Sequence, residues 1–369
     1  MSTRLREDER LAAVLGVALG AAFVVSFATG LLSHLAQNPP SWFSWPARPA
    51  GLYRVTQGLH VVVGIATIPL LLAKLWVVYP KFLRWPPAET VPELLERASL
   101  VPLVGGGLFL VGTGLANING WYPWPFGFRL SHYWVAWVTV GALTTHVLAK
   151  WATTRDALAG RTAARLDVAP GQLDRRGFLG LAFGASGLLV MLTAGQTVRP
   201  LERLALLAPR RPSVGPQGFP VNKSAEEAEV EELLDDAEYR LVVDGRVPRP
   251  LRLTREQLTL LPQHEAVLPI ACVEGWSVSK RWRGVRVRDL LDQAGAADHA
   301  TARVHSLQRS GAYNTSELNR EQTEDPDTLL AVEVEGEPLH RDHGYPVRLI
   351  GPNRPGVQQT KWVERVEVL

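Results

Sequence analysis

The sequence of 369 residues has few sulfur-containing residues and few charged residues. It holds one cysteine, Cys272, and two methionines. A single cysteine excludes a disulfide within the chain and a zinc site built from several thiolates. Only 20% of the residues are charged, and 39 Lys and Arg nearly balance 36 Asp and Glu. The formal net charge of +3 therefore gives no reason to expect a nucleic-acid partner, and the composition argues against a disordered or collagen-like chain.

Long apolar runs are present instead, and nearly all of them lie before residue 200. A helix needs about 20 apolar residues to cross a hydrocarbon core of about 30 Å. We expect five transmembrane helices, over residues 11–35, 55–78, 100–116, 132–151 and 178–198. The third run is the shortest and is rich in glycine, which suits close packing of helices.

The distribution of Lys and Arg between the short connections predicts the orientation. With the N-terminus inside, the inner segments carry Arg4, Arg6, Arg10, Lys81, Arg84, Arg97, Arg155, Arg161, Arg165, Arg175 and Arg176. The outer loops carry only Arg48, Arg54 and Arg129, together with many aromatic residues. Five spans then place everything after residue 198 outside. We expect a multi-pass protein in the lipid of the cytoplasmic (inner) membrane, with a periplasmic or extracellular C-terminal domain.

An arginine pair, Arg175-Arg176, stands immediately before the fifth run and is followed by Gly-Phe-Leu. The pair and the moderately apolar run behind it resemble a twin-arginine export motif, the signal for domains that cross a membrane already folded around a cofactor. Two arginines that obey the positive-inside rule would give the same pair. Both interpretations stay open.

Four of the nine histidines lie in or at the ends of the expected spans: His34, His60, His132 and His146. Ionisable side chains at membrane depth are rare and are functional candidates by default. On one helix, His132 and His146 would lie about 21 Å apart along the axis and within about 40° of the same face. This spacing suits one haem in each leaflet, with each iron taking its second axial ligand from another helix. His60 lies at the depth of His132 and is its natural partner for an outer haem.

The other two histidines are harder to assign. No second histidine lies at the depth of His146, so a second haem lacks a partner ligand. His34, at the outer end of the first span, could ligate the outer iron in place of His60, line a quinone pocket or face the interface. All four could instead cap helices or form interhelical hydrogen bonds. The expected domain over residues 1–152 resembles, over about residues 10–152, the four-helix b-type cytochrome subunits of membrane formate dehydrogenases and hydrogenases. This resemblance implies haem b and electron exchange with quinone or quinol.

The rest of the chain divides into a connection and a soluble domain. Residues 153–198 hold the inner loop, the arginine pair and the fifth span, and residues 199–237 are expected to be a linker. The acidic stretch 225–238 favours a short solvated helix. Short strands and helices separated by Gly, Pro and Asp turns follow, up to a C-terminal strand at 362–369. They predict an α+β domain over residues 238–369.

The single cysteine stands in the segment Pro-Ile-Ala-Cys272-Val-Glu-Gly-Trp-Ser, with a helix-like stretch at 288–293 after it. A lone cysteine behind an apolar run is more often a small buried hydrophobe than a ligand. This segment, however, resembles the molybdenum-ligand segment of the sulfite oxidase family, which includes the periplasmic methionine sulfoxide reductase catalytic subunit. The resemblance implies that Cys272 gives the one protein thiolate to a molybdenum held by a pterin dithiolene, a role that suits a soft ligand.

Further segments resemble the same family and follow in its order. Ser306-Leu-Gln and Gly-Ala-Tyr313-Asn-Thr-Ser resemble the loop of the active-site tyrosine, so Tyr313 is the candidate beside the metal. Residues 338–349 resemble the pterin-binding turn, and Gln-Thr-Lys-Trp at 359–362 closes the match. The cofactor-binding candidates that follow are Asn222, Ser306, His343, Arg348, Thr360 and Lys361.

A charged fork and an ammonium are what a phosphate-bearing pterin requires, which supports Arg348 and Lys361 independently. Structural roles remain as alternatives: Arg348 on a strand surface, His343 as a turn cap, Tyr313 as a half-buried loop aromatic. The Phe-Phe-x-Arg-Asn-His-type segment of sulfite oxidase itself, which carries a substrate arginine, is absent from the sequence, and so is its small haem domain. Sulfite is therefore not favoured as the substrate.

Together these resemblances imply a molybdopterin oxidoreductase fused to its own membrane electron carrier. Oxygen-atom transfer to or from a small-molecule or protein-bound substrate would take place at the Cys272-ligated molybdenum, with electrons exchanged through haem b with the quinone pool. Two alternatives remain: a molybdenum enzyme with a haem-free anchor, and a membrane-anchored binding protein without catalysis. The sequence does not fix the direction of the reaction.

Overall fold

The computed structural model describes all residues except 1–4, 6–7, 83–84, 86–89, 162–172 and 235–236. Four of the arginines used to orient the spans lie outside the described residues: Arg4, Arg6, Arg84 and Arg165. The chain divides into two compact units. The helical unit comprises Met1–Leu31, Leu59–Gly195 and Arg203–Ala208, and the sheet unit comprises Leu32–Gly58, Gln196–Glu202 and Pro209–Leu369.

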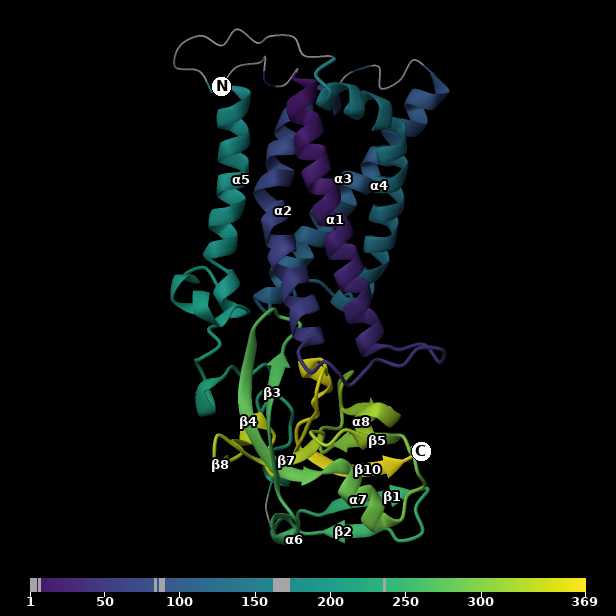
Figure 1. The fold of residues 1–369 in the computed structure, drawn as a ribbon, viewed down its shortest axis with the longest axis vertical. Helices are drawn as coiled ribbons and strands as arrows, with labels where there is room; N and C mark the ends of the chain where they lie inside the picture. The colour runs from purple at the N-terminus through teal and green to yellow at the C-terminus, as the bar shows by residue number, and fades with distance from the viewer. Residues whose placement is uncertain (1–4, 6–7, 83–84, 86–89, 162–172, 235–236) are drawn as a thin grey trace. The chain divides into compact units, whose positions relative to one another are not determined.

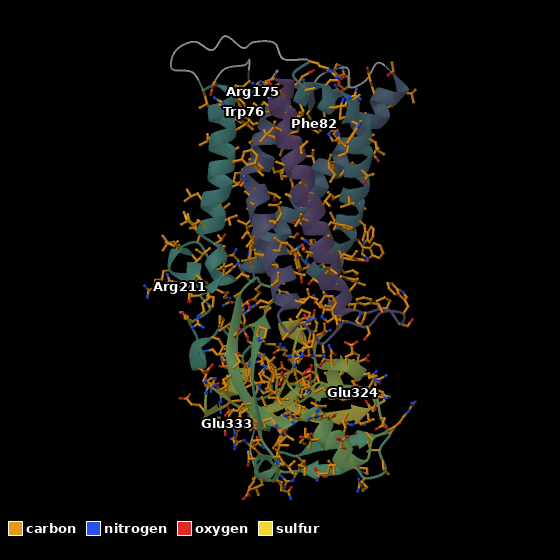
Figure 2. All side chains as sticks on the ribbon, in the orientation of Figure 1. Trp76, Phe82, Arg175, Arg211, Glu324 and Glu333 are labelled. Carbon is orange, nitrogen blue, oxygen red and sulfur yellow. The ribbon has the colours of Figure 1, made fainter. Side chains whose placement is uncertain are left out.

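Helices form over all five apolar runs (Figure 1), as predicted. They are α1 Glu9–Gln37, α2 Leu52–Phe82, α3 Val91–Ile118, α4 Phe128–Leu158 and α5 Arg175–Met191. Figure 2 shows mostly carbon along the middle of these helices and more nitrogen and oxygen towards their ends. This distribution is what a membrane-spanning helix needs.

Four stretches of the described chain are both long and apolar enough to cross a membrane: Glu9–Gln37, Leu52–Phe82, Glu96–Ile118 and Arg175–Gln196. Helix α4 differs from the prediction, because it has the length but not the hydropathy. Its two histidines, its lysine and several threonines lower the average. Large apolar side chains are nevertheless exposed on it, namely Trp134, Trp137, Val138, Leu148 and Trp151.

The glycine-rich α3 packs closely against α4, as expected. A Cβ atom at Gly106 would lie 2.1 Å from Oγ1 of Thr139, so the approach requires glycine. The arginine pair opens α5, where the Asp174 side chain accepts a hydrogen bond from the Gly177 N–H at 2.7 Å and caps the helix. Arg175 lies 3.5 Å from Asp8. These local roles agree with either interpretation of the pair, and the export motif stays a prediction.

The sheet unit contains two five-stranded sheets (Figure 1). The first has the order β2-β1-β10-β5-β6 and is formed by β1 Leu241–Gly245, β2 Leu251–Leu253, β5 Ala302–Ser306, β6 Thr315–Leu318 and β10 Val363–Val368. Its β1 and β10 pair in parallel, and its other pairs are antiparallel. Buried and half-buried residues alternate along β1 and β5, as on strands with one face in a core.

The second sheet has the order β3-β4-β7-β8, with β9 also paired to β7. Its strands are β3 His264–Ala271, β4 Ser277–Arg286, β7 Leu329–Val334, β8 Glu337–Pro338 and β9 Arg348–Ile350. The described helices of this unit include α6 Arg255–Leu260, α7 Val287–Ala294 and α8 Arg320–Glu324. The predicted α+β class is confirmed, and so are the helix near 288–293 and the C-terminal strand.

The acidic stretch 225–238 is not the solvated helix that its charge suggests. Among its described residues, the only helical element is the short 3₁₀ turn Glu231–Leu233, and four apolar residues lie in the core of the first sheet: Ala225, Ala228, Val230 and Leu234. Their spacing does not follow one helix face, so an irregular backbone buries them where a helix could not. Phe219, inside the predicted linker, is 1% exposed. The linker residues from Phe219 onwards therefore contribute to the sheet unit.

The segment Leu32–Gly58, which comprises the end of α1, the connection that follows it and the start of α2, belongs to the sheet unit. We call it the α1–α2 segment. Trp45 Nε1 donates to the Asn353 carbonyl at 2.8 Å, and the Asn353 side chain accepts from the Tyr53 N–H at 2.7 Å. Arg48 forms ion pairs with Asp325 at 2.8 Å and Asp327 at 2.5 Å. The expected outer loop is thus a structural part of the C-terminal domain.

Trp45 gives a direct test of this packing, because its side chain is 3% exposed. We expect Trp45→Ala to lower the free energy of unfolding of the sheet unit by about 3–5 kcal/mol, the usual cost of truncating a buried tryptophan. Trp42→Ala is the matched control, since Trp42 on the same segment is 79% exposed. Denaturant unfolding of the full chain in detergent measures the difference. Equal stability of the two variants would contradict the packing.

Candidate active site

Cys272 lies directly after β3, in the tight turn that leads into β4. Its N–H donates to the Trp276 carbonyl at 2.9 Å, and its carbonyl accepts from the Gly275 N–H at 3.0 Å. The side chain is 3% exposed and belongs to the hydrophobic core of the second sheet. The pairing of β3 with β4 therefore fixes the position of the thiol.

The thiol lines a small, partly open cavity. The lining residues are Phe219, Pro220, Asn222, Ile270, Cys272, Trp276, His343, Arg348 and Gly356. Four of the candidates from the sequence meet here, namely Asn222, Cys272, His343 and Arg348. They come from three separate segments, since His343 and Arg348 belong to the same turn, so the fold brings together what the sequence keeps apart.

Burial and the nearby Glu274 carboxylate both raise the pKa of the Cys272 thiol well above its usual range. Although the charge of Arg210 lowers the pKa, the sulfur keeps its proton at neutral pH. A metal ion that binds here must displace that proton, as metals do when they bind cysteine. The Cys272 sulfur is therefore a protonated thiol that becomes a thiolate when a strong Lewis acid binds it.

Arg348 is 5% exposed, so its predicted site role is favoured over the surface alternative. Its Nη1 donates to the His343 carbonyl at 3.0 Å, while its buried Nε has no hydrogen-bond partner among the described atoms. Burial alone lowers the pKa of Arg348 to about 9. A guanidinium buried without a compensating carboxylate favours an anionic ligand.

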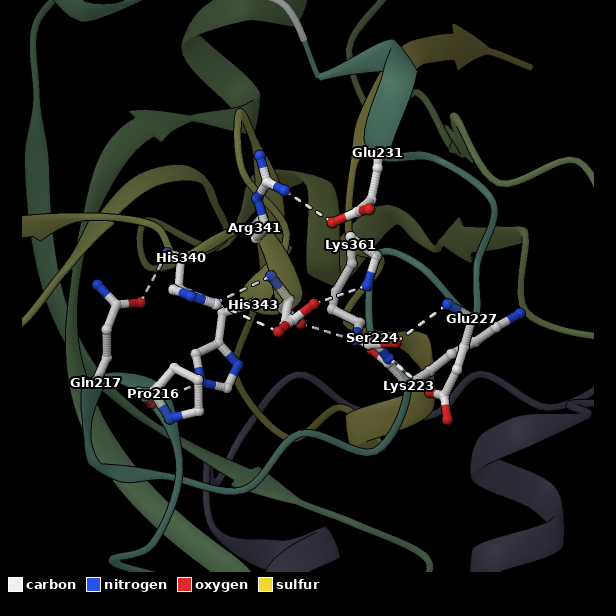
Figure 3. A network of polar contacts seen from close by, with 12 residues as sticks. Pro216, Gln217, Lys223, Ser224, Glu227, Glu231, His340, Arg341, His343 and Lys361 are labelled. Atoms are coloured by element: carbon white, nitrogen blue, oxygen red, sulfur yellow. Dashed lines mark hydrogen bonds and ion pairs between the residues drawn. The ribbon is translucent and has the colours of Figure 1, made fainter.

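Lys361 lies in a polar network near the same turn (Figure 3). Its Nζ donates to the carbonyls of Asp342, at 3.0 Å, and of Lys223, while the Asp342 carboxylate accepts from the Ala225 N–H at 2.7 Å. Burial and the charge of Arg348 lower the pKa of Lys361 to about 7. Carbonyls thus orient this ammonium, and an anion would stabilise its charge.

His343 is held as a neutral ring. It stacks on Phe219 with the ring centroids 3.6 Å apart, and its Nε2 lies 2.8 Å from the Pro216 carbonyl (Figure 3). Burial and the Arg348 charge lower the pKa of His343 to about 3. Since a carbonyl only accepts, Nε2 carries the proton, and Nδ1 is left as an acceptor at neutral pH.

Three other candidates lie outside the cavity lining. The Ser306 hydroxyl donates to the Lys361 carbonyl at 2.8 Å, and the Thr360 hydroxyl lies 2.7 Å from that of Ser316. Both therefore brace the strand ends around Lys361. The half-buried Tyr313 hydroxyl donates to the side chain of Gln37 at 2.8 Å, a residue of the α1–α2 segment.

Sequence reasoning missed Arg354 and Gln37. Arg354 is 2% exposed, donates to the carbonyls of Glu317 and Gln358, and has a pKa that burial lowers to about 9. The turn Gly-Pro-Asn-Arg-Pro-Gly at 351–356 is a local signal that could have indicated it. Gln37 carried no such signal, since it stands at the end of an apolar helix.

In the helical unit, the rings of His60 and His132 lie edge to face, with their planes at 68° and their centroids 6.3 Å apart. The Nδ1 of His60 lies 2.8 Å from the Ser26 carbonyl, and the Nδ1 of His132 lies 3.0 Å from the Thr113 hydroxyl. A Cβ atom at Gly30 would come within 3.0 Å of the His60 ring. His146 and His34 do not belong to this pair. The buried Nδ1 of His146 has no partner among the described atoms, and His34 belongs to the sheet unit.

Comparison with known proteins assigns the sheet unit. Residues 227–369 match the family described as the oxidoreductase molybdopterin binding domain. The C-terminal half is a molybdopterin-binding oxidoreductase domain. This confirms the resemblance to the sulfite oxidase family that the Cys272 segment indicated.

Individual relatives agree with this assignment. Mouse mitochondrial sulfite oxidase is 33% identical over 162 residues, which cover 37% of this chain and 30% of that protein. The protein-methionine-sulfoxide reductase catalytic subunit MsrP of Gluconobacter oxydans is 30% identical over 146 residues, covering 36% and 47%. YedZ1 of Azospira oryzae, named as a subunit of such a reductase, is 32% identical over 163 residues, covering 44% and 61%. The chain thus spans less than two thirds of each relative.

The residues around the cavity of the molybdopterin-binding domain fit the cofactor that its family name implies. The cavity offers a soft sulfur, an arginine with an orphaned Nε and a neutral histidine acceptor, with a buried lysine close by. A thiolate suits molybdenum, and the two cations suit a phosphate-bearing pterin. The site is therefore incomplete without an anionic, metal-bearing ligand.

The lowered pKa of Lys361 predicts how the cofactor-free protein responds to pH. Between pH 7 and its unfolded-state pKa of 10.5, Lys361 binds more protons in the unfolded chain than in the folded one. The contribution of this group to stability therefore rises with pH in this window. From pH 7 to pH 9 we expect a gain of about 2 kcal/mol from this group. Denaturant unfolding at the two pH values measures it.

Lys361→Met should remove this gain, because the variant has no group to titrate. Lys280→Met is the control, since Lys280 lies on β4 and donates to the Gln217 carbonyl, whereas Lys361 donates to the carbonyls of Lys223 and Asp342. The explanation would be wrong if wild type and Lys361→Met showed the same difference between pH 7 and pH 9.

Proposed function

We propose that this protein is a membrane-bound molybdopterin oxidoreductase whose active domain faces outward and exchanges electrons with the quinone pool through a membrane haem b. The observation that carries the proposal is the cavity in which Cys272 meets Arg348 and His343, in a domain of the molybdopterin-binding family. The four apolar stretches support the membrane location, and the asymmetry of Lys and Arg supports the orientation.

Each residue of the site has a role that follows from its surroundings. Cys272 would bind molybdenum as thiolate, and Arg348 and Lys361 would hold the anionic part of the pterin. His343 would accept a hydrogen bond at Nδ1, and Asn222 lines the same cavity. When bound, the cofactor supplies oxygen-atom transfer coupled to two-electron redox chemistry. The protein fixes its position and excludes water around the buried sulfur.

The substrate that we propose is a sulfoxide, free or in a protein, and the direction is reduction. Two of the relatives carry names of protein-methionine-sulfoxide reductase subunits. One of these names belongs to a catalytic subunit and the other names only a subunit, and the present chain matches both. Oxidation of a substrate such as sulfite, with electrons flowing to quinone, uses the same parts in the opposite direction.

The histidine pair supports one haem between His60 and His132. Their ring centroids lie 6.3 Å apart within the helical unit, so these two imidazoles would hold the iron of a haem bound there. Bonds from the second ring nitrogen to a carbonyl or hydroxyl are typical of metal-binding histidines. A bound haem supplies one-electron transfer within the bilayer.

Elemental analysis and a dithionite-reduced difference spectrum of the full chain in detergent test the proposal. We expect about one molybdenum per chain together with a b-type absorption band. Molybdenum without the band would favour a haem-free anchor. Absence of both, in protein from cells that make the cofactor, would favour a binding protein without catalysis and overturn the proposal.

A further inference from the structure

A chain of hydrogen bonds leads from Tyr313 into the α1–α2 segment. The Tyr313 hydroxyl donates to Oε1 of Gln37 at 2.8 Å, and Nε2 of Gln37 donates to the Ser33 hydroxyl at 3.1 Å. The Ser33 hydroxyl lies 3.1 Å from the hydroxyl of Tyr53. Ser33 is 8% and Tyr53 1% exposed, so the far end of the chain is closed to water.

The Gln37 amide has a defined orientation in this chain. Its Nε2 donates to both the carbonyl and the hydroxyl of Ser33, at 3.2 and 3.1 Å. Its Oε1 is therefore the atom turned towards Tyr313, and it fixes the direction of the tyrosine O–H. The Gln37 main chain is held as well, because its carbonyl accepts from the Gln358 side chain at 2.9 Å.

The α1–α2 segment also forms hydrogen bonds with residues that follow Cys272. The Gln57 side chain donates to the Val273 carbonyl at 3.3 Å, next to the cysteine, and Arg54 donates to the Ser279 hydroxyl at 3.0 Å. The segment thus reaches the cysteine turn and the tyrosine loop at once.

We propose that Gln37, supported by Ser33 and Tyr53, is a positioning residue that holds Tyr313 in place. The α1–α2 segment thereby completes the molybdopterin site. The part that concerns activity rests on the proposed function. Apolar packing around Trp45 already attaches the α1–α2 segment to the domain. Attachment alone would therefore not require a buried series of hydrogen bonds that ends at Tyr313, the tyrosine of the family motif.

A double-mutant cycle separates positioning from general stability. In full-length enzyme in detergent, with reduced benzyl viologen and free methionine sulfoxide as probes, we expect Gln37→Leu to lower kcat/KM about tenfold, the worth of roughly one hydrogen bond. In the Tyr313→Phe background the same change should have no further effect. Gln37→Glu keeps an acceptor and should recover most of the loss.

The control is Asn38→Leu, since Asn38 is exposed next along the chain and bonds back to His34. Molybdenum content should be equal in all variants. Equal losses from Gln37→Leu in both backgrounds, or no rescue by Gln37→Glu, would overturn the proposal.

Hydrogen exchange tests the positioning without reference to activity. In cofactor-free protein, amides of residues 309–314 should exchange several-fold faster in Gln37→Leu than in wild type or Asn38→Leu. Unchanged exchange would overturn the proposal even if the enzyme were active. Faster exchange in a protein that proves inactive would support the positioning and reject only the proposed function.

Discussion

Cys272→Ala yields a protein that folds normally but contains no molybdenum and has no oxidoreductase activity. The expected loss is well over a hundredfold, because removing even an outer partner of a metal ligand costs about 10–100-fold. No other cysteine can replace it, since the chain has one. Elemental analysis and dye-linked turnover measure the two effects, and the melting temperature of cofactor-free protein reports on the fold.

The matched control for this variant is Val267→Ala. Val267 lies on the same strand, β3, but is 67% exposed and points away from the core. It should keep both molybdenum and turnover. Retention of bound molybdenum in Cys272→Ala would show that groups other than the Cys272 sulfur hold the metal. It would remove the basis of the proposed function.

His132→Ala and His60→Ala should each abolish the b-type absorption band while leaving the molybdenum content unchanged. Each variant removes one of the two rings that would hold the iron. The metal site of the sheet unit lies in a separate core and should not respond. Quinol-driven turnover should fall with the band, whereas dye-driven turnover should persist.

His34→Ala and His146→Ala complete this experiment. The outer haem should survive in both, because neither residue belongs to the observed pair. A partial loss in His146→Ala alone would indicate a second haem with that residue as a ligand. Survival of the whole band in both His60→Ala and His132→Ala would contradict the assignment of the pair.

Local patterns were sufficient for much of the architecture. Apolar runs of about 20 residues predicted all five helices, because a helix in lipid is specified by its own composition. The segment around Cys272 predicted the family, and the spacing of His60 and His132 predicted their pairing. Helix α4 deviates in hydropathy because it carries His132 and His146 as well as polar residues.

Contacts between distant residues were beyond the sequence. The α1–α2 segment contains Pro, Trp and Gly and has the composition of an exposed loop, yet Trp45 bonds to Asn353 more than 300 residues away. Burial of Ala225 and Val230 depends on a sheet formed by later residues. Likewise, the partner of Tyr313 is Gln37, at the end of a helix that composition assigns to the membrane. No local period encodes such pairs.

The most direct test of the central claim, that one chain joins a molybdenum site to a membrane haem, is a stopped-flow measurement of the haem band. Purified wild type reduced with one equivalent of dithionite should lose its reduced band when methionine sulfoxide is added, and Cys272→Ala should keep it. If oxidation is the true direction, sulfite should reduce the oxidised haem in the same pair of proteins. A haem that responds to neither compound in molybdenum-loaded wild type, or responds equally in Cys272→Ala, would contradict the account.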